Sequence, residues 1–208
     1  MKNNIIDVYD RISKKYYEVR ENMALMPEIE KLCSLLNKGD HILDAGCGNG
    51  RDLMIFNKKG FYVTGIDFSD GQLNFARQRI TDTKISLEKQ DILHLDFPEN
   101  SFNAIWCCAV LSHYRKSDVI KVLKSFFCLL KSGGLSFIIL KKGKGEQYVV
   151  EKEFDGITRF TTFFSEEDIY EMAEESSFSV IDIYSYNEQE RFSICNRNID
   201  FIVAILKK

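Results

Sequence analysis

The stretch from His41 to Asp67, HILDAGCGNGRDLMIFNKKGFYVTGID, decides the fold of this chain. It opens on a short apolar strand, 41–45, and continues through a helix-like segment that closes at Gly60. A second apolar strand, 61–66, follows and ends in the acid Asp67. Strand, helix and strand in this order predict a βαβ unit of a parallel sheet.

The turn between the first strand and the helix carries glycines at alternate positions, Gly46, Gly48 and Gly50. Glycine permits a tight turn and leaves no side chain between the main chain and a ligand. The N–H groups at the start of the next helix can then meet an electronegative group. An acid about 20 residues further on, here Asp67, suits the two hydroxyls of a ribose. The stretch therefore predicts a site for a nucleoside cofactor.

The spacing of the glycines separates several cofactor classes. The turn reads G-x-G-x-G, with Asp52 where a G-x-G-x-x-G pattern would continue, and no G-K-[ST] follows as in a phosphate-binding loop. The form D-A-G-C-G-N-G, with Asp44 two residues before the first glycine, resembles motif I of the class I S-adenosylmethionine methyltransferases. A carboxylate there favours a cofactor that carries an ammonium and a sulfonium, whereas it would repel a pyrophosphate. An ordinary glycine turn of a βαβ unit is the alternative.

Length and composition set the broad class. A chain of 208 residues with 45% apolar and 28% charged residues is typical of one soluble globular domain. The net charge of −3 gives no overall basic field for nucleic acid. No apolar run reaches the roughly 18 residues of a membrane span, and the N-terminal sequence lacks the apolar core of a secretory signal. We expect no membrane partner.

The six cysteines form neither a C-x-x-C pair nor the pattern of a disulfide framework. Most of them fall in apolar segments, where a free cysteine behaves as a small hydrophobe. A reducing cytoplasm is the expected compartment. No ligand cluster for a metal is visible, which also argues against Cys107 and Cys108 as a metal pair or vicinal disulfide.

Hydrophobic periodicity and cap signals predict the remaining elements. Helices are expected over 4–20, 27–36, 69–80, 116–131 and from Ser165, and strands over 85–87, 102–108, 135–140, 178–186 and 199–206. Capping boxes are expected at Ser69 with Gln72 and at Ser165 with Asp168, and Gly133-Gly134 as a helix stop. The alternation of strands and helices predicts a doubly wound α/β sheet.

The resemblance to class I methyltransferases implies a single domain over 1–208, with a seven-stranded, mostly parallel sheet whose last strand inserts antiparallel. It also implies that the N-terminal helices, 1–38, act as a lid over the cofactor. Residues 141–164 are irregular and rich in glycine, charge and aromatic side chains, and we interpret them as a substrate-side excursion that can contain a hairpin.

The same resemblance implies the cofactor-binding residues. Asp44, Gly46, Cys47 and Gly48 would surround the methionine moiety, and Asp67 would hold the ribose hydroxyls, with a helix N-cap as its alternative role. The remaining positions would contact adenine, pack on the cofactor or cover it; they are Phe68 on the adenine face, Asp91 at the adenine amino group, Ile92 through its backbone N–H, Cys108 at the end of the fourth strand, and Tyr16 and Arg20 on the lid. A solvated loop acid is the alternative for Asp91.

Two residues are catalytic candidates, His113 and Tyr16. His113 follows the fourth strand at the carboxyl edge, where ligands bind in open α/β sheets, and its pKa near neutrality suits a general base. A histidine that only packs or hydrogen-bonds is an equal alternative for His113. Methyl transfer needs a base only when the acceptor has a proton to lose, so positioning can supply much of the catalysis.

The sequence thus predicts a cytoplasmic S-adenosylmethionine-dependent methyltransferase, monomer or homodimer, that acts on a small-molecule O, N or C acceptor. A tRNA- or RNA-modifying methyltransferase is one alternative, although the acidic net charge favours it less. A non-catalytic S-adenosylmethionine- or nucleotide-binding regulatory protein is another, and a nicotinamide oxidoreductase is the third. Which acceptor is used does not follow from the fold.

Overall fold

The structure is a computed structural model that describes residues 2–192 and 197–208, with side chains described from Ile5 onward. Cys195, one of the six cysteines, lies outside the described residues. The chain divides into two compact units, the first formed by Met1–Asp96 with Val150–Arg159 and the second by Phe97–Val149 with Phe160–Lys208. The single domain over 1–208 stays a prediction.

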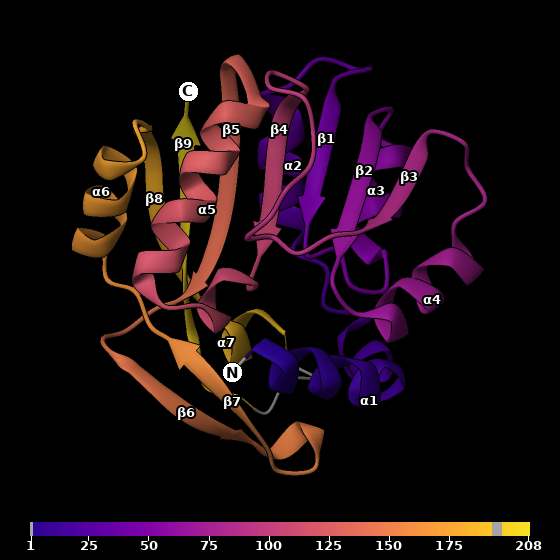
Figure 1. Cartoon of the computed structure of the whole chain (residues 1–208), viewed down its shortest axis with the longest axis vertical. Coiled ribbons are helices and arrows are strands. Elements are labelled where there is room, and N and C mark those ends of the chain that lie inside the picture. The colour runs from indigo at the N-terminus through magenta and orange to yellow at the C-terminus, as the bar shows by residue number, and fades with distance from the viewer. Residues whose placement is uncertain (1, 193–196) are drawn as a thin grey trace. The chain divides into compact units, whose positions relative to one another are not determined.

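The described residues of the first unit include three parallel strands and four α-helices (Figure 1). In chain order they are α1 (Lys2–Arg20), α2 (Met26–Ser34), β1 (His41–Ala45), α3 (Arg51–Lys58), β2 (Tyr62–Asp67), α4 (Asp70–Arg79) and β3 (Ile85–Lys89). β2 pairs with β1 on one side and β3 on the other, with Asp44 beside Gly65 in register. The carboxyl ends of β1 and β2 therefore lie side by side.

The second unit contains the other four strands of the main sheet. Its elements are β4 (Phe102–Cys108), η1 (Leu111–His113), α5 (Lys116–Leu129), β5 (Leu130–Lys141), α6 (Glu166–Glu175), β8 (Ser179–Asn187), α7 (Glu188–Arg191) and β9 (Asp200–Lys207). β9 runs antiparallel to both β5 and β8. The strand order is β3-β2-β1-β4-β5-β9-β8, which confirms the predicted seven-stranded sheet with an antiparallel last strand.

The predicted excursion is a hairpin (Figure 1). Strands β6 (Glu146–Glu151) and β7 (Ile157–Thr162) form a separate two-stranded sheet, and the short helix η2 (Lys152–Phe154) lies at its turn. The tip of this hairpin, Val150–Arg159, is the part grouped with the first unit.

Burial explains why β4 reads as one apolar run. Ala104, Ile105, Trp106 and Cys107 are all fully buried, as expected for an inner strand covered on both faces. Among the described helices, none is both long and apolar enough to cross a membrane.

Three local predictions need correction. Helix α5 ends at Leu129, before the glycines, because Leu130 is already extended and pairs with Phe102. The spacing of apolar residues predicts Phe127 on the inward face of this helix, but the buried aromatic residue is Phe126 and Phe127 is only half-buried. The predicted capping box of α4 is one-sided, since the Ser69 hydroxyl accepts from the Gln72 N–H while the Ser69 N–H donates to a carboxylate of β2. The capping box at Ser165 is confirmed.

Candidate cofactor and active site

The glycine turn after β1 has a backbone that only glycine adopts readily. Gly46, Gly48 and Gly50 have φ angles of 86°, 54° and 79°, all in the left-handed region. The N–H groups of Gly46 and Cys47 donate to the Ile66 carbonyl at 2.8 and 2.9 Å. The turn is thereby fixed to the end of β2.

Asp67 ties the glycine turn to the start of α4. Its Oδ2 accepts from the Gly48 N–H and its Oδ1 accepts from the Ser69 N–H, both at 2.9 Å. Burial raises the pKa of this carboxyl to about 6, although these backbone N–H groups oppose the shift by stabilising the charged form. The N-cap of α4 is Ser69 and not Asp67, which lies at the end of β2 and accepts from the backbone N–H of that N-cap residue.

Asp44 is a buried acid that lacks a full set of partners. Only 3% of its surface is exposed, and its Oδ2 has no hydrogen-bond partner among the described residues. Burial raises the pKa of Asp44 well above its usual value, the nearby Asp52 raises it further, and Arg51 lowers it. A buried carboxylate oxygen in this position matches a cationic ligand group, since an unpaired buried charge is costly. Cys47, next to it, is buried and its thiol pKa is raised by the same burial.

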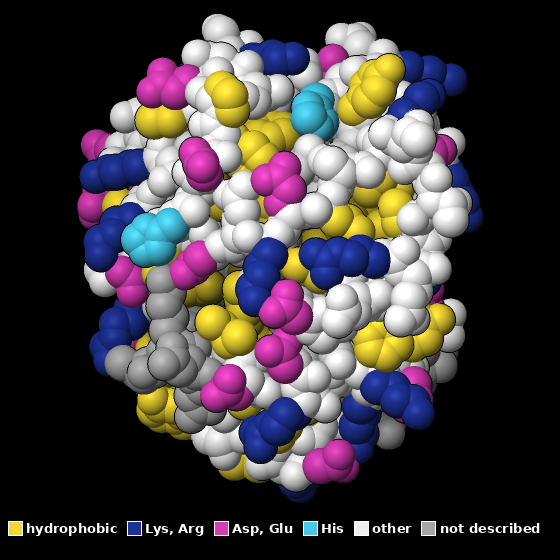
Figure 2. Space-filling view, turned by 45° about the vertical axis from the view of Figure 1, so that its right-hand side comes forward, with side chains coloured by type: hydrophobic (Ala, Val, Ile, Leu, Met, Phe, Trp, Pro, Cys, Tyr) yellow, Lys and Arg dark blue, Asp and Glu magenta, His cyan; other side chains and the backbone are white. Residues whose placement is uncertain are grey.

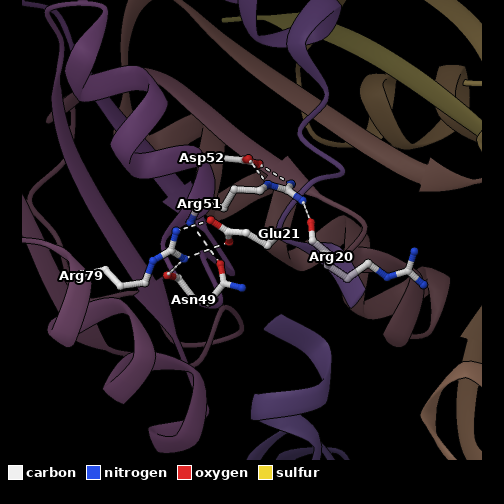
Figure 3. A network of polar contacts seen from close by, with 6 residues as sticks. All are labelled: Arg20, Glu21, Asn49, Arg51, Asp52 and Arg79. Atoms are coloured by element: carbon white, nitrogen blue, oxygen red, sulfur yellow. Dashed lines mark hydrogen bonds and ion pairs between the residues drawn. The ribbon is translucent and has the colours of Figure 1, made fainter. Parts of the chain in front are cut away.

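Figure 3 shows the polar network around the rim of the turn. Arg51 binds both carboxylate oxygens of Asp52, at 2.7 and 3.1 Å, and donates to the backbone carbonyl of Arg20 at 2.9 Å. Arg79 pairs with Glu21 and also donates to the carbonyl of Asn49, which lies in the turn. The end of α1 is thus held beside the glycine turn by two arginines.

Arg20, predicted to bind the cofactor, points away from this network (Figure 3). Its guanidinium is buried, pairs with Glu153 at 2.5 Å and lies over the ring of Phe154 at 5.6 Å. The backbone carbonyl of Arg20 accepts from Arg51 beside the turn.

A second contact joins α1 to the site, through Asp10. Its Oδ1 accepts from the Ser69 hydroxyl at 2.5 Å and from the Gly71 N–H at 2.9 Å, at the start of α4. A Cβ on Gly71 would lie 3.0 Å from the Asp10 Cα, so glycine permits this close approach. Sequence reasoning missed Asp10, because an acid on the polar side of an amphipathic helix gives no signal of its distant partner.

The tip of the hairpin packs against α1 through a cluster of aromatic and charged side chains. Arg159 is 4% exposed, pairs with Glu151 and donates to the Tyr9 hydroxyl at 2.5 Å. Tyr16 stacks on Phe154, with ring centroids 5.7 Å apart. The spacing of apolar residues in α1 predicts Tyr9 as a core contact, and Tyr9 does pack against the buried Val8, Ile12 and Phe154. Its hydroxyl also belongs to the polar cluster, and burial raises the pKa of its phenol.

The predicted adenine-side residues lie in the same unit. Phe68 contacts the Tyr9 ring edge-on at 5.9 Å. Asp91 accepts from the Leu93 N–H at 3.0 Å, a local turn contact, and Ile92 is buried. The loop that carries them is joined to β2 by the Gln90 N–H, which donates to the Asp67 carbonyl at 3.2 Å.

His113 and Cys108 belong to the second unit. The Nδ1 of His113 lies 3.1 Å from the carbonyl oxygen of Phe160, on the hairpin strand β7. Cys107, Cys108 and the other described cysteines are free thiols. No cluster of metal-ligating side chains is found among the described residues.

Comparisons with known proteins agree with this geometry. A family model described as a methyltransferase domain matches residues 42–134, which run from β1 into β5. The ubiquinone biosynthesis O-methyltransferase of Coxiella burnetii is 28% identical over 173 residues, which are 78% of this chain and 72% of that protein. The chain thus contains a methyltransferase domain over 42–134 and is similar to class I methyltransferases in its sheet order.

Two further methyltransferases illustrate the range of the likeness. The phosphoethanolamine N-methyltransferase of Plasmodium falciparum is 33% identical over 105 residues, 50% of this chain and 40% of that protein, so the match spans less than half of that relative. The crystal structure of Burkholderia thailandensis 1,6-didemethyltoxoflavin-N1-methyltransferase, with S-adenosylhomocysteine bound, has a TM-score of 0.75 at 19% identity, covering 99% of this chain and 89% of that one. Family, enzyme class and the family's cofactor, S-adenosylmethionine, are as predicted.

The residues of this site fit S-adenosylmethionine. The unpartnered oxygen of Asp44 suits an ammonium, and the buried carboxylate of Asp67 suits ribose hydroxyls. Gly48 leaves the turn between these two acids without a side chain. The individual roles assigned to the site residues stay predictions.

Proposed function

We propose that this protein transfers the methyl group of S-adenosylmethionine to a small-molecule acceptor through oxygen, nitrogen or carbon. One observation carries the proposal: two buried acids, Asp44 and Asp67, flank a glycine turn, and one of them has an oxygen with no partner among the described residues. The named relatives above, an O-methyltransferase of ubiquinone biosynthesis and a phosphoethanolamine N-methyltransferase, support a small acceptor.

Asp44 would bind the ammonium of the cofactor, and Asp67 would bind its ribose hydroxyls. The Asp91 carboxylate and the Ile92 N–H would form hydrogen bonds with adenine. When bound, the cofactor supplies a methyl group on a sulfonium, whose sulfur leaves as a neutral thioether. The protein's part is then to orient the reactants in line and to keep water out.

His113 is the candidate general base for an acceptor that must lose a proton. A carbonyl oxygen can only accept, so the contact of His113 Nδ1 with the Phe160 carbonyl favours the tautomer with its proton on Nδ1. The lone pair then lies on Nε2, which is the atom that would take a proton. Tyr16 keeps its place as a candidate on α1, with its ring stacked on Phe154.

The cover of the site is proposed to be α1 together with the hairpin tip, 150–159. Ion pairs join these segments, namely Arg20 with Glu153 and Lys15 with Asp155. Such a cover would exclude water and help to select the acceptor. We further propose that the protein is cytoplasmic and is a monomer or a homodimer.

Thermal unfolding of the ligand-free protein with single ligands tests the proposal. S-adenosylmethionine and S-adenosylhomocysteine should each stabilise the protein, by about 2.7 kcal/mol at a hundredfold excess over the dissociation constant. NADH and tRNA should not, and on the face drawn in Figure 2 basic side chains are interspersed with acidic ones. No stabilisation by either sulfur compound would overturn the proposal, and stabilisation by tRNA would favour the RNA-modifying alternative.

Binding without turnover would favour the regulatory alternative. Incubation with methyl-labelled S-adenosylmethionine and a pool of small metabolites, followed by detection of labelled product, separates the two. Labelled product from the pool supports the methyltransferase. A protein that binds the cofactor but labels nothing in the pool or in added tRNA would be assigned as a binding protein.

A further inference from the structure

The side chain of Gln72 is buried without hydrogen bonds. Gln72 lies in the first turn of α4, and only 1% of its surface is exposed. Its backbone N–H donates to the Ser69 hydroxyl at 3.1 Å, but among the described residues neither Oε1 nor Nε2 of its side chain has a partner. Burying an amide in this way destabilises a fold, because both groups lose their contacts with water.

The unpaired amide faces the glycine turn. A Cβ built on Gly48 would lie 3.6 Å from Oε1 of Gln72. The N–H of that same glycine donates to Asp67. The Gln72 amide and the Asp67 carboxylate therefore both adjoin Gly48, one from α4 and one from the end of β2.

The neighbouring inward positions of α4 show that packing alone does not require an amide here. Leu73 and Ala76 are fully buried and apolar. An unbranched apolar side chain at position 72 would fill similar space without leaving a donor and an acceptor unpaired. The amide therefore lowers the stability of the ligand-free protein, and a ligand that pairs with it would remove that penalty.

We propose that Gln72 is a further cofactor-positioning residue, whose amide pairs with the nucleoside part of the cofactor. This rests on the proposed function above. An amide offers donors and an acceptor together, and so do ribose hydroxyls and the edge of adenine. Asp67 would bind the ribose at the turn beside Gly48, so the Gln72 amide lies next to the nucleoside with which it would form hydrogen bonds.

The variant Gln72→Met separates this role from a structural one, because it predicts changes of opposite sign. The ligand-free variant should unfold at a temperature about 3 °C higher than the wild type, since an unpaired buried amide is gone. Its affinity for S-adenosylhomocysteine, measured by calorimetry, should fall about tenfold. Gln78→Met is the matched control, because Gln78 is exposed on the same helix, and it should change neither quantity.

A structural glutamine would give a different result. If Gln72→Met lowers the unfolding temperature and leaves the affinity unchanged, the amide stabilises the fold and the proposal is wrong. If the wild type does not bind S-adenosylhomocysteine at all, the proposed function fails instead, and the two failures are thus distinguishable.

A truncated ligand tests the nucleoside assignment. 5′-Methylthioadenosine keeps adenine and ribose but lacks the amino acid part. Gln72→Met should weaken its binding by the same factor as it weakens S-adenosylhomocysteine. A loss confined to S-adenosylhomocysteine would place the amide at the amino acid end and overturn the assignment.

Discussion

The glycine turn and the cover differ in how their carboxylates are paired. At the turn, Asp44 has an oxygen without a partner among the described residues, and burial raises the pKa of both Asp44 and Asp67. In the cover, formed by α1 and the hairpin tip 150–159, each of three carboxylates has a cation: Glu151 with Arg159, Glu153 with Arg20 and Asp155 with Lys15. At the turn, a carboxylate oxygen is therefore available to bind a ligand. In the cover, the carboxylates form ion pairs that stabilise the fold.

This difference predicts a crossed pattern of mutational effects. Substitutions in the cover should reduce stability with little effect on cofactor affinity. Substitutions in the turn should reduce cofactor affinity with little effect on stability.

The largest effect on stability is expected from Arg159→Ala in the cover. The substitution takes a cation from the Glu151 carboxylate, which is 5% exposed, and a donor from Tyr9, so the free energy of unfolding should fall by about 3–5 kcal/mol. Urea denaturation measures this change. Affinity for S-adenosylhomocysteine, measured where the variant is folded, should change by less than about fivefold, a shift below 1 kcal/mol.

Lys15→Ala is the control for that prediction, because the Lys15–Asp155 pair is on the surface. Exposed ion pairs contribute about 0–1 kcal/mol. A loss as large as that of Arg159→Ala would show that burial does not explain the difference between the pairs.

Asp67→Asn should give the largest loss of affinity in the turn. It would remove the proposed charge-assisted bonds to the ribose, each worth roughly 1.5–3 kcal/mol, so affinity for S-adenosylhomocysteine should fall at least about tenfold. The asparagine oxygen can keep one of the two backbone contacts, and the unfolding free energy should change by less than about 1.5 kcal/mol. Unchanged affinity in calorimetry would mean that the ribose is not held by Asp67.

The pH dependence of cofactor affinity should also distinguish the turn from the cover. The pKa of Asp67 is raised to about 6 in the folded protein, so its contribution to stability is present at low pH and is lost as the pH rises through about 6. In its proposed role Asp67 binds the ribose as a carboxylate, so affinity should fall as the pH drops below about 6, by up to about tenfold per unit. Calorimetry between pH 5 and 8 should show this slope in the wild type and a smaller one in Asp67→Asn. Equal slopes in both proteins would assign the titration to another group.

The smallest effect is expected where the two regions meet, at Asp10. Asp10→Ala removes a carboxylate that accepts at the start of α4, and it should lower stability by about 1 kcal/mol. Cofactor affinity should fall a few-fold if α1 covers the site. Asp7→Ala, an exposed acid on the same helix, is the control and should leave both quantities unchanged. Identical behaviour of the two variants would separate α1 from the site.

The sequence by itself determined the βαβ unit and its turn. Glycines at alternate positions between two apolar strands, with an acid at the end of each, specify local backbone and charge over 27 contiguous residues, 41–67. The strand 41–45 agrees with β1, and the continuous apolar run 102–108 agrees with β4. Such features involve residues that are close together in the sequence, so the sequence pattern alone predicts them.

Only the tertiary structure decided what joins the cover and which polar atoms lack partners. Arg159 donates to Tyr9 across 150 positions, and Asp10 accepts from Ser69 across 59, and no periodicity encodes such a pairing. Gln72 read as half of a capping box, and only the packing of α4 against the turn shows that its amide is buried without a partner among the described residues. Burial and pairing depend on which segments fold together, and for these side chains that information is spread over the whole chain.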